Sequence, residues 1–292
     1  MKRILITLAI AALGLFTANA EERTKTYEFK NITGIEAGFT YDIHVTHGRS
    51  NVVTIVYDSM YEDYMSVNYY GISGTLCLQM NDLSRKLRNS SHPNIKVYLE
   101  MTKVEDIELS GASSITFEGE FSTSELDLDM SGASHLHSLK IKGTSLSADC
   151  SGASNSTIEG YFTDDIDVEV SGASELNFYG RANSLEGDIS GAAQFEGEFE
   201  VETCSIECSG AAAAIIEGSA KKVSLDGSGA CGINTRDFIA EIVNVSLSGA
   251  SKAKVYASKH LKYDVSRTCK MTYYGDAELE NISEDNNIVR GR

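Results

Sequence analysis

Residues 126–153 have the sequence LDLDMSGASHLHSLKIKGTSLSADCSGA, in which one arrangement occurs twice. A run of alternating apolar and polar residues leads into the triplet Ser-Gly-Ala, and a second alternating run follows the first triplet. Alternation with a period of two is typical of β-strands that have one buried face. Glycine suits the turn between the runs, because it adopts a positive φ without a clash from a Cβ atom. This stretch therefore predicts strands joined at tight corners.

The corner recurs along the chain. Ser-Gly-Ala occurs eight times, and successive glycines are 19 to 21 residues apart. A ninth, degenerate copy is Ser266-Arg267-Thr268, with arginine in the glycine position. A period this constant indicates a stacked repeat architecture. The corner glycines, to which we assign a structural role, are Gly111, Gly132, Gly152, Gly172, Gly191, Gly210, Gly229 and Gly249.

Similar residues occupy the same repeat position in successive copies. The position six residues before the corner glycine holds Leu126, Leu146, Ile166, Leu185, Cys204, Val223 and Val243. Parallel stacking in register produces such columns, whereas antiparallel hairpins do not require them. One 20-residue unit also has too little apolar surface to be stable alone. We therefore predict an all-β fold, a right-handed parallel β-helix of about nine coils of ~20 residues.

Four segments follow from this reading. Residues 1–20 are predicted to be a signal peptide, residues 21–100 a β-rich N-terminal region that caps the coil, residues 101–279 the repeat β-helix, and residues 280–292 a polar C-terminal tail. A cap is expected because an exposed strand edge invites aggregation.

The start of the chain predicts export. A basic Met1-Lys2-Arg3, an apolar run and Ala18-Asn19-Ala20 form the pattern of a cleaved secretory signal. No later segment is long and apolar enough to be a membrane helix, so we expect no transmembrane span in the mature chain. The mature protein is expected in the periplasm, at the cell surface or outside the cell.

The net charge of the chain limits the classes of molecule that it can bind. Lys and Arg number 25 against 42 Asp and Glu, for a formal net charge of −17. Cleavage after residue 20 removes two basic residues, so the mature charge is 23 − 42 = −19. A strongly acidic surface repels phosphate backbones, so nucleic acid is excluded as a partner.

The most unusual column lies three residues before the corner glycine. Seven carboxylates in successive repeats, here called the acidic ladder, are Glu108, Asp129, Asp149, Glu169, Asp188, Glu207 and Asp226; Ser246 then interrupts the column and Asp264 resumes it. Neighbours ~4.8 Å apart repel by roughly 0.9 kcal/mol in water. Two explanations are open. The carboxylates accept hydrogen bonds from corner serines or amides, which we favour, or Ca²⁺ bridges adjacent coils, because calcium prefers carboxylate oxygens.

The six cysteines are interpreted as buried thiols rather than disulfides. Cys150 and Cys208 share one inward position but are three coils apart, roughly 14 Å by coil rise, which is too far for a bridge. Buried thiols behave as small apolar residues.

No catalytic motif is present: the sequence lacks a nucleophile elbow, a phosphate loop and an HExxH segment. We predict that the protein is not an enzyme and has no cofactor apart from the calcium considered for the ladder. Tyr256 and Tyr274 fall at matching positions of consecutive coils and are a candidate ligand surface, although packing against the C-terminal tail is the interpretation that we prefer.

The serial corners, together with the lead-in segments 29–35 (FKNITGI) and 45–48 (VTHG), resemble the head GIN domain family of putative auto-transporter adhesins, exported proteins of Bacteroidetes. The resemblance covers roughly residues 27 to 277. It implies an adhesin with a β-helix similar in shape to pectin lyases, and it carries over no catalytic residues. Arg267 departs from the repeated corner.

The favoured function is a non-catalytic exported β-helix, an adhesin or a module that binds a surface glycan or protein. One alternative is a lyase-like enzyme that acts on polysaccharides with part of the acidic ladder. Another is a structural component of the cell envelope, with coils that associate end to end as oligomers.

Overall fold

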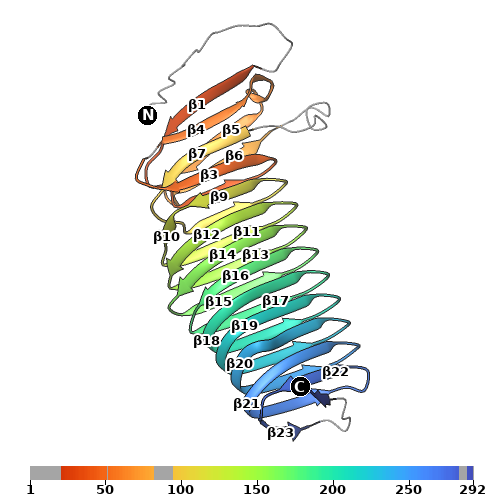
Figure 1. The fold of residues 1–292 in the computed structure, drawn as a ribbon. Coiled ribbons are helices and arrows are strands. Elements are labelled where there is room, and N and C mark those ends of the chain that lie inside the picture. Colours follow the sequence, from red (N-terminus) through yellow and green to blue (C-terminus); the bar gives the residue numbers. More distant parts are fainter. Residues whose placement is uncertain (1–20, 51, 82–94, 283–287, 292) are drawn as a thin grey trace.

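The computed structural model describes residues 21–50, 52–81, 95–282 and 288–291. The predicted signal peptide lies outside these residues. Within them the chain forms an all-β solenoid of about nine turns, stacked coil upon coil into an elongated rod (Figure 1). The predicted β-helix is therefore confirmed. Its strands pair in parallel along the rod, and the predicted column of Leu126, Leu146 and Ile166 consists of register partners on adjacent coils.

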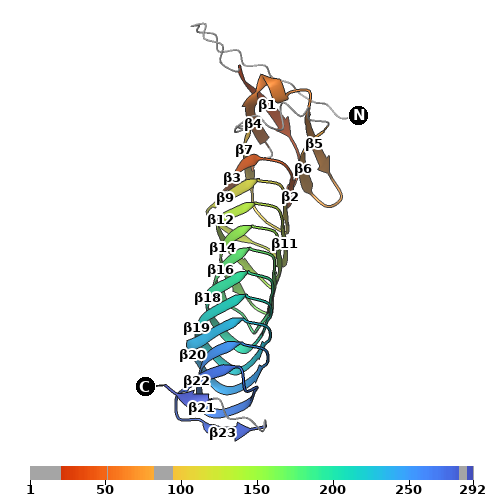
Figure 2. The ribbon, with the colours of Figure 1, turned by 90° about the vertical axis from the view of Figure 1, so that its right-hand side faces the viewer.

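Each coil has one strand before its corner and one after it. The strands before the corners pair in parallel and in register, and they are β2 (Gly34–Ala37), β8 (Asp106–Leu109), β11 (Glu125–Met130), β13 (Ser145–Cys150), β15 (Asp165–Val170) and β17 (Ser184–Ile189). The strands after the corners are β3 (Tyr41–His47), β9 (Ser114–Glu118), β12 (His135–Gly143), β14 (Asn155–Phe162) and β16 (Glu175–Arg181), with the short β10 (Glu120–Ser122) beside β12. Figure 2 shows β9, β12, β14 and β16 along one side of the rod and β11 along the other.

Toward the C-terminus the strands lengthen until each one runs from one corner to the next. These long strands are β18 (Gln194–Cys208), β19 (Ala213–Gly227), β20 (Gly232–Leu247) and β21 (Lys252–Val265). The last coil is made of β22 (Lys270–Tyr274) and β23 (Glu278–Asn281), which both pair with β21, and β24 (Ile288–Arg290) pairs with β22 beyond it. Part of the polar tail thus adds strands to the end of the rod.

The corners stack directly on one another. All eight corner glycines have φ between +70° and +75°. The amide that follows each of them donates to the carbonyl of the corresponding residue on the preceding coil, as from Ala153 to Gly132 at 2.7 Å and from Ala173 to Gly152 at 2.8 Å. The corner is therefore a hydrogen-bonded column that continues the ladder of the strands.

The solenoid begins before the first Ser-Gly-Ala. Strands β2 and β3 form a complete coil that pairs with β8 and β9, and its corner is Gly38-Phe39-Thr40. Phe39 occupies the glycine position with a φ of +87°, and its carbonyl accepts a hydrogen bond from Ala112. This coil lies within the segment assigned to the N-terminal region.

Above that coil the order of the strands departs from the order of the chain. Strands β6 (Thr75–Met80) and β7 (Ile95–Met101) pair in parallel with β2 and β3. Antiparallel strands then cover them: β4 (Val52–Asp58) lies on β7, β1 (Glu22–Glu28) lies on β4, and β5 (Met65–Tyr70) lies on β6. A short 3₁₀ helix, η1 (Ser59–Tyr61), follows β4.

A continuous apolar core fills the inside of the rod, from Ile35 at the first coil to Met271 at the last. Cys150, Cys204, Cys208, Cys231 and Cys269 belong to this core as buried free thiols, as the column positions predict; Cys77 on β6 is also a buried free thiol but lies outside the core cluster. Burial raises the pKa of the Cys204 thiol to about 12, so the thiol stays protonated at neutral pH. The thiols therefore serve as packing groups.

Candidate functional site: the acidic ladder and its serine row

The acidic ladder runs in register along the strands that precede the corners. Each of its seven carboxylates is the Cα partner of the next, from Glu108 on β8 to Asp226 on β19. The buried residues on either side of each carboxylate turn it outward, because side chains alternate along a strand. The file continues upward to Glu36 on β2, which pairs with Glu108.

Glu36 is absent from the sequence-based ladder, because its coil lacks the triplet used for alignment. The sequence nevertheless contains a pattern that identifies Glu36 as a member of the file. Ile35-Glu36-Ala37 alternates in the same way as Ile107-Glu108-Leu109, which precedes a regular corner.

Burial and mutual repulsion raise the pKa values of carboxyls at the N-terminal end of the ladder. Burial and the neighbouring Glu36 and Asp129 raise the pKa of Glu108. Burial and Asp129 likewise raise the pKa of Asp149, and burial with Asp127 and Asp129 raises the pKa of Asp106, which lies two residues before Glu108 on β8. Asp129 contributes to all three shifts, so it is the centre of the repulsion at this end of the ladder.

Asp129→Asn is expected to increase the free energy of unfolding at pH 7 by about 0.5–1 kcal/mol at low salt. Folding raises the pKa values of its neighbours above their unfolded values, 3.8 for Asp and 4.5 for Glu. The charged ladder therefore destabilises the folded chain at neutral pH, and this effect disappears as the pH falls through the folded pKa values to below the unfolded ones. Urea unfolding at pH 7, 6, 5 and 4 measures the gain, which should shrink with acidification.

Asp63→Asn is the matched control, because it removes the same charge from an exposed turn after η1. It should change stability little at any of these pH values. A gain from Asp129→Asn that persists unchanged at pH 4 would contradict the repulsion argument.

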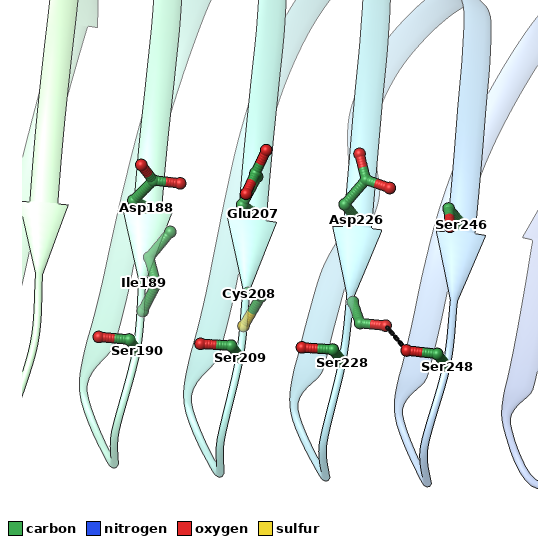
Figure 3. Close-up of a pocket in the computed structure, with 11 residues that line it drawn as sticks. Asp188, Ile189, Ser190, Glu207, Cys208, Ser209, Asp226, Ser228, Ser246 and Ser248 are labelled. Atoms are coloured by element: carbon green, nitrogen blue, oxygen red, sulfur yellow. Dashed lines mark hydrogen bonds between the residues drawn. The ribbon is translucent and has the colours of Figure 1, made fainter.

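A second row runs beside the ladder. The corner serines Ser190, Ser209, Ser228 and Ser248 stand parallel to Asp188, Glu207 and Asp226, and the two rows line a groove of about 320 Å³ (Figure 3). We call these seven residues the acid–serine groove. Its lining consists of carboxylates, hydroxyls, backbone and apolar side chains, and no basic residue is among the described residues that form it.

Two corner serines form side-chain hydrogen bonds to backbone carbonyls of the preceding coil. The hydroxyl of Ser151 donates to the carbonyl of Met130 at 3.2 Å, and that of Ser248 donates to the carbonyl of Gly227 at 3.5 Å. At these two corners the serine therefore supports the stack of coils rather than a ladder carboxylate.

The ladder carboxylates lack the ion pairs that several other acids of the rod form. Elsewhere on the solenoid, some lysines pair with glutamates of adjacent coils, as in Lys140–Glu159 at 2.7 Å and Lys259–Glu241 at 2.7 Å, and Lys221 pairs with Glu202. Across the described part of the chain, no ladder carboxylate forms an ion pair. The ladder thus remains a row of unneutralised charge.

Metal binding by the ladder would have to use pairs of carboxylates. In the residues that the structure covers, no three His, Cys, Asp or Glu side chains converge into a group that could hold an ion. A Ca²⁺ ion at the ladder would bridge two adjacent coils and complete its shell with water or with oxygens of a ligand.

Tyr256 and Tyr274 are register partners on β21 and β22. The guanidinium of Arg236 lies 4.9 Å from the centre of the Tyr274 ring. Gly291, which bonds to the carbonyl of Tyr273 at 2.8 Å, lies against the same ring. The Tyr274 ring is therefore occupied by contacts within the chain.

The family model described as "Putative auto-transporter adhesin, head GIN domain" matches residues 31–184 and 167–277. The chain belongs to this family. The match includes the coil of β2 and β3 and every corner of the rod. Among the residues that the structure describes, no helix is long and apolar enough to cross a membrane.

Solved structures of two putative adhesins share the fold. A putative adhesin from Parabacteroides distasonis has a TM-score of 0.52 at 13% identity, with 93% of this chain and 97% of that one covered. A putative adhesin from Parabacteroides merdae has a TM-score of 0.51 at 14% identity, with 93% and 96% covered. No curated protein sequence matches the chain. At these identities the likeness concerns the fold alone.

Proposed function

We propose that this head GIN protein is an exported, non-catalytic adhesin that binds a surface glycan or protein along the acid–serine groove. The observation that carries the proposal is the unneutralised ladder. Several other glutamates of the rod, such as Glu159, Glu202 and Glu241, have lysine partners on the adjacent coil, whereas all seven ladder carboxylates have none among the described residues. A row of charges that repel one another is stabilised by a partner that supplies hydrogen-bond donors or cations.

The geometry suits a repetitive partner. Carboxylates and hydroxyls recur once per coil, so a polymer or flat surface can make the same contact several times. Weak contacts repeated in this way give high overall avidity on a rigid scaffold. The ladder offers acceptors and the serine row offers hydroxyls, which match the hydroxyl and amino groups of a glycan or the basic side chains of a protein.

A lyase function receives no support from the groove, because its lining supplies no basic residue to abstract a proton beside the acids. Incubation with acidic polysaccharides should therefore release no unsaturated products that absorb ultraviolet light. A purely structural role predicts instead end-to-end association, which light scattering over a range of concentrations detects.

The test is binding of the mature chain to a glycan array and to extracted surface proteins, with and without millimolar Ca²⁺. The groove variant Glu207→Gln/Asp226→Asn should weaken binding at least about tenfold, since each lost charged hydrogen bond contributes on the order of 1.5–3 kcal/mol. The control Glu202→Gln/Glu241→Gln removes two charges that are paired with Lys221 and Lys259.

The control should bind as the wild type does. Equal binding by the groove variant and the wild type would refute the assignment of the groove. A requirement for Ca²⁺ that the groove variant loses would show that the cation bridges the ladder to the ligand. Binding that is independent of Ca²⁺ would show direct contact.

A further inference from the structure

A second hollow lies on strand segments that follow the corners. Figure 2 shows these strands on the side of the rod opposite the ladder strand β11. It has a volume of about 250 Å³ and is contributed by β14, β16 and β18. Two of its tyrosines are exposed, Tyr161 at 50% and Tyr179 at 43%. We call it the tyrosine pocket, and its lining side chains are Glu159, Tyr161, Tyr179, Arg181, Glu198 and Glu200.

The register of the strands sets the two tyrosines apart on a diagonal. Tyr179 is the Cα partner of Glu159, and Tyr161 is the partner of Arg181. Two residues along a strand and one strand across correspond to a Cα separation of about 8 Å. A flat ring of the size of a sugar fits between side chains at that spacing.

Backbone at Gly180 forms part of the surface between the two tyrosines. Gly180 lies between Tyr179 and Arg181 and lines the pocket. A Cβ atom on Gly180 would lie 2.1 Å from the carbonyl oxygen of Gly160 on the adjacent coil and 3.2 Å from the buried ring of Phe178, so it would point toward the core and not into the pocket. Gly180 therefore contributes only backbone to the pocket.

The charges around the pocket nearly cancel. Glu159 pairs with Lys140 at 2.7 Å, and Arg181 pairs with Glu200. Only Glu198 has no ion-pair partner among the described residues that line the pocket. The pocket thus offers several donors and acceptors with little net charge. This arrangement disfavours phosphates and polyanions, and it provides less attraction for a cation than the ladder does.

We infer that the tyrosine pocket binds the pyranose ring of a neutral sugar. The C–H face of the ring packs against Tyr161 and Tyr179, while the hydroxyls at its rim bond to Glu159, Arg181 and Glu198. Aromatic faces flanked by a few placed polar groups are the usual composition of small-ligand sites. The inference deepens the proposed adhesin function by naming a ligand class, and it places that ligand outside the acid–serine groove.

The experiment is saturation-transfer NMR and calorimetric titration of the mature chain with the methyl pyranosides of glucose, galactose, mannose and N-acetylglucosamine. At least one should bind. Tyr179→Ala and Tyr161→Ala should each weaken that binding about tenfold, because each removes an aromatic face that packs against the sugar ring. Tyr179→Phe should retain it, because the ring face remains.

Tyr98→Ala is the matched control. Tyr98 is 42% exposed, like Tyr179, but it stacks on His44 in the N-terminal cap, away from the pocket. It should leave binding unchanged, and thermal melts verify that each variant is folded.

The inference is overturned if no pyranoside binds the wild-type chain, or if the two alanine variants bind as the wild type does. Preference for a basic peptide over every sugar would also overturn it. The groove variant Glu207→Gln/Asp226→Asn separates the two proposals. If this variant loses surface binding while no pyranoside binds the wild type, the sugar site in the pocket is refuted and the groove proposal is supported. If pyranosides bind but the groove variant keeps full surface binding, the groove proposal is refuted and the sugar site is supported.

Discussion

Gly172→Ala should lower the free energy of unfolding by about 2–4 kcal/mol. Gly172 has a φ of +72°, and an L-residue with a Cβ in the left-handed region costs roughly 1–2 kcal/mol. The new Cβ would also lie 2.7 Å from the carbonyl oxygen of Gly152, closer than Cβ atoms in proteins approach another atom. That oxygen accepts a hydrogen bond from the amide of Ala173 at 2.8 Å, so the backbone cannot move away from the new Cβ without losing the hydrogen bonds between stacked corners.

Gly232→Ala is the control for this substitution. Gly232 is not among the glycines of positive φ, and a Cβ there would have no heavy atom within 4 Å. Its replacement should be neutral or stabilise by up to about 1 kcal/mol, because alanine reduces the freedom of the unfolded chain. Urea unfolding followed by circular dichroism measures both. Similar stabilities of the two variants would mean that corner geometry does not require glycine.

Phe178→Ala should lower the free energy of unfolding by about 3–5 kcal/mol, which is the usual cost of a cavity of this size in a core. Phe178 is completely buried, and its ring makes edge-to-face contacts with Phe162 and Phe199, with centroids 6.3 and 5.4 Å away. These rings come from three successive coils. The cavity therefore weakens the interface between repeats, on which the stability of a solenoid depends.

The adjacent residue provides the comparison. Tyr179 follows Phe178 on β16 but faces outward, so Tyr179→Ala should change the unfolding free energy by no more than about 0.5 kcal/mol. Thermal and urea unfolding of both variants decide the matter. A loss at Tyr179 equal to that at Phe178 would show that the alternation of inner and outer faces is not as described.

The repeat itself could be predicted from the sequence because each coil packs the same types of apolar residue at the same inward positions. Period-two alternation identifies the strands, glycine identifies the corners, and the constant spacing identifies the parallel stack. The acidic ladder followed from the same alignment, since any column of residues in a solenoid becomes a row on its surface.

The N-terminal coil was missed for a physical reason. Phe39 takes the left-handed conformation that glycine takes elsewhere, so the corner carries no recognisable triplet. The antiparallel strands above it depend on pairings between segments far apart in the chain, such as β1 with β4, and no local pattern encodes them.

The tyrosine pocket could not be predicted from the sequence either. Tyr161 and Tyr179 stand at different repeat positions, and they become neighbours only through the register of β14 on β16. The lysine partners of the outer glutamates are likewise set by which side chains meet across adjacent coils, as Lys221 meets Glu202.

The sequence by itself determined the coil, its inward columns and the file of carboxylates, because these depend on periodicity along a single strand and on the steric freedom of glycine. Only the tertiary structure decided where the solenoid begins, which acids are neutralised and where two tyrosines line one hollow. Those features depend on distances between side chains of different coils, which the register of neighbouring strands fixes and a local pattern of residues does not.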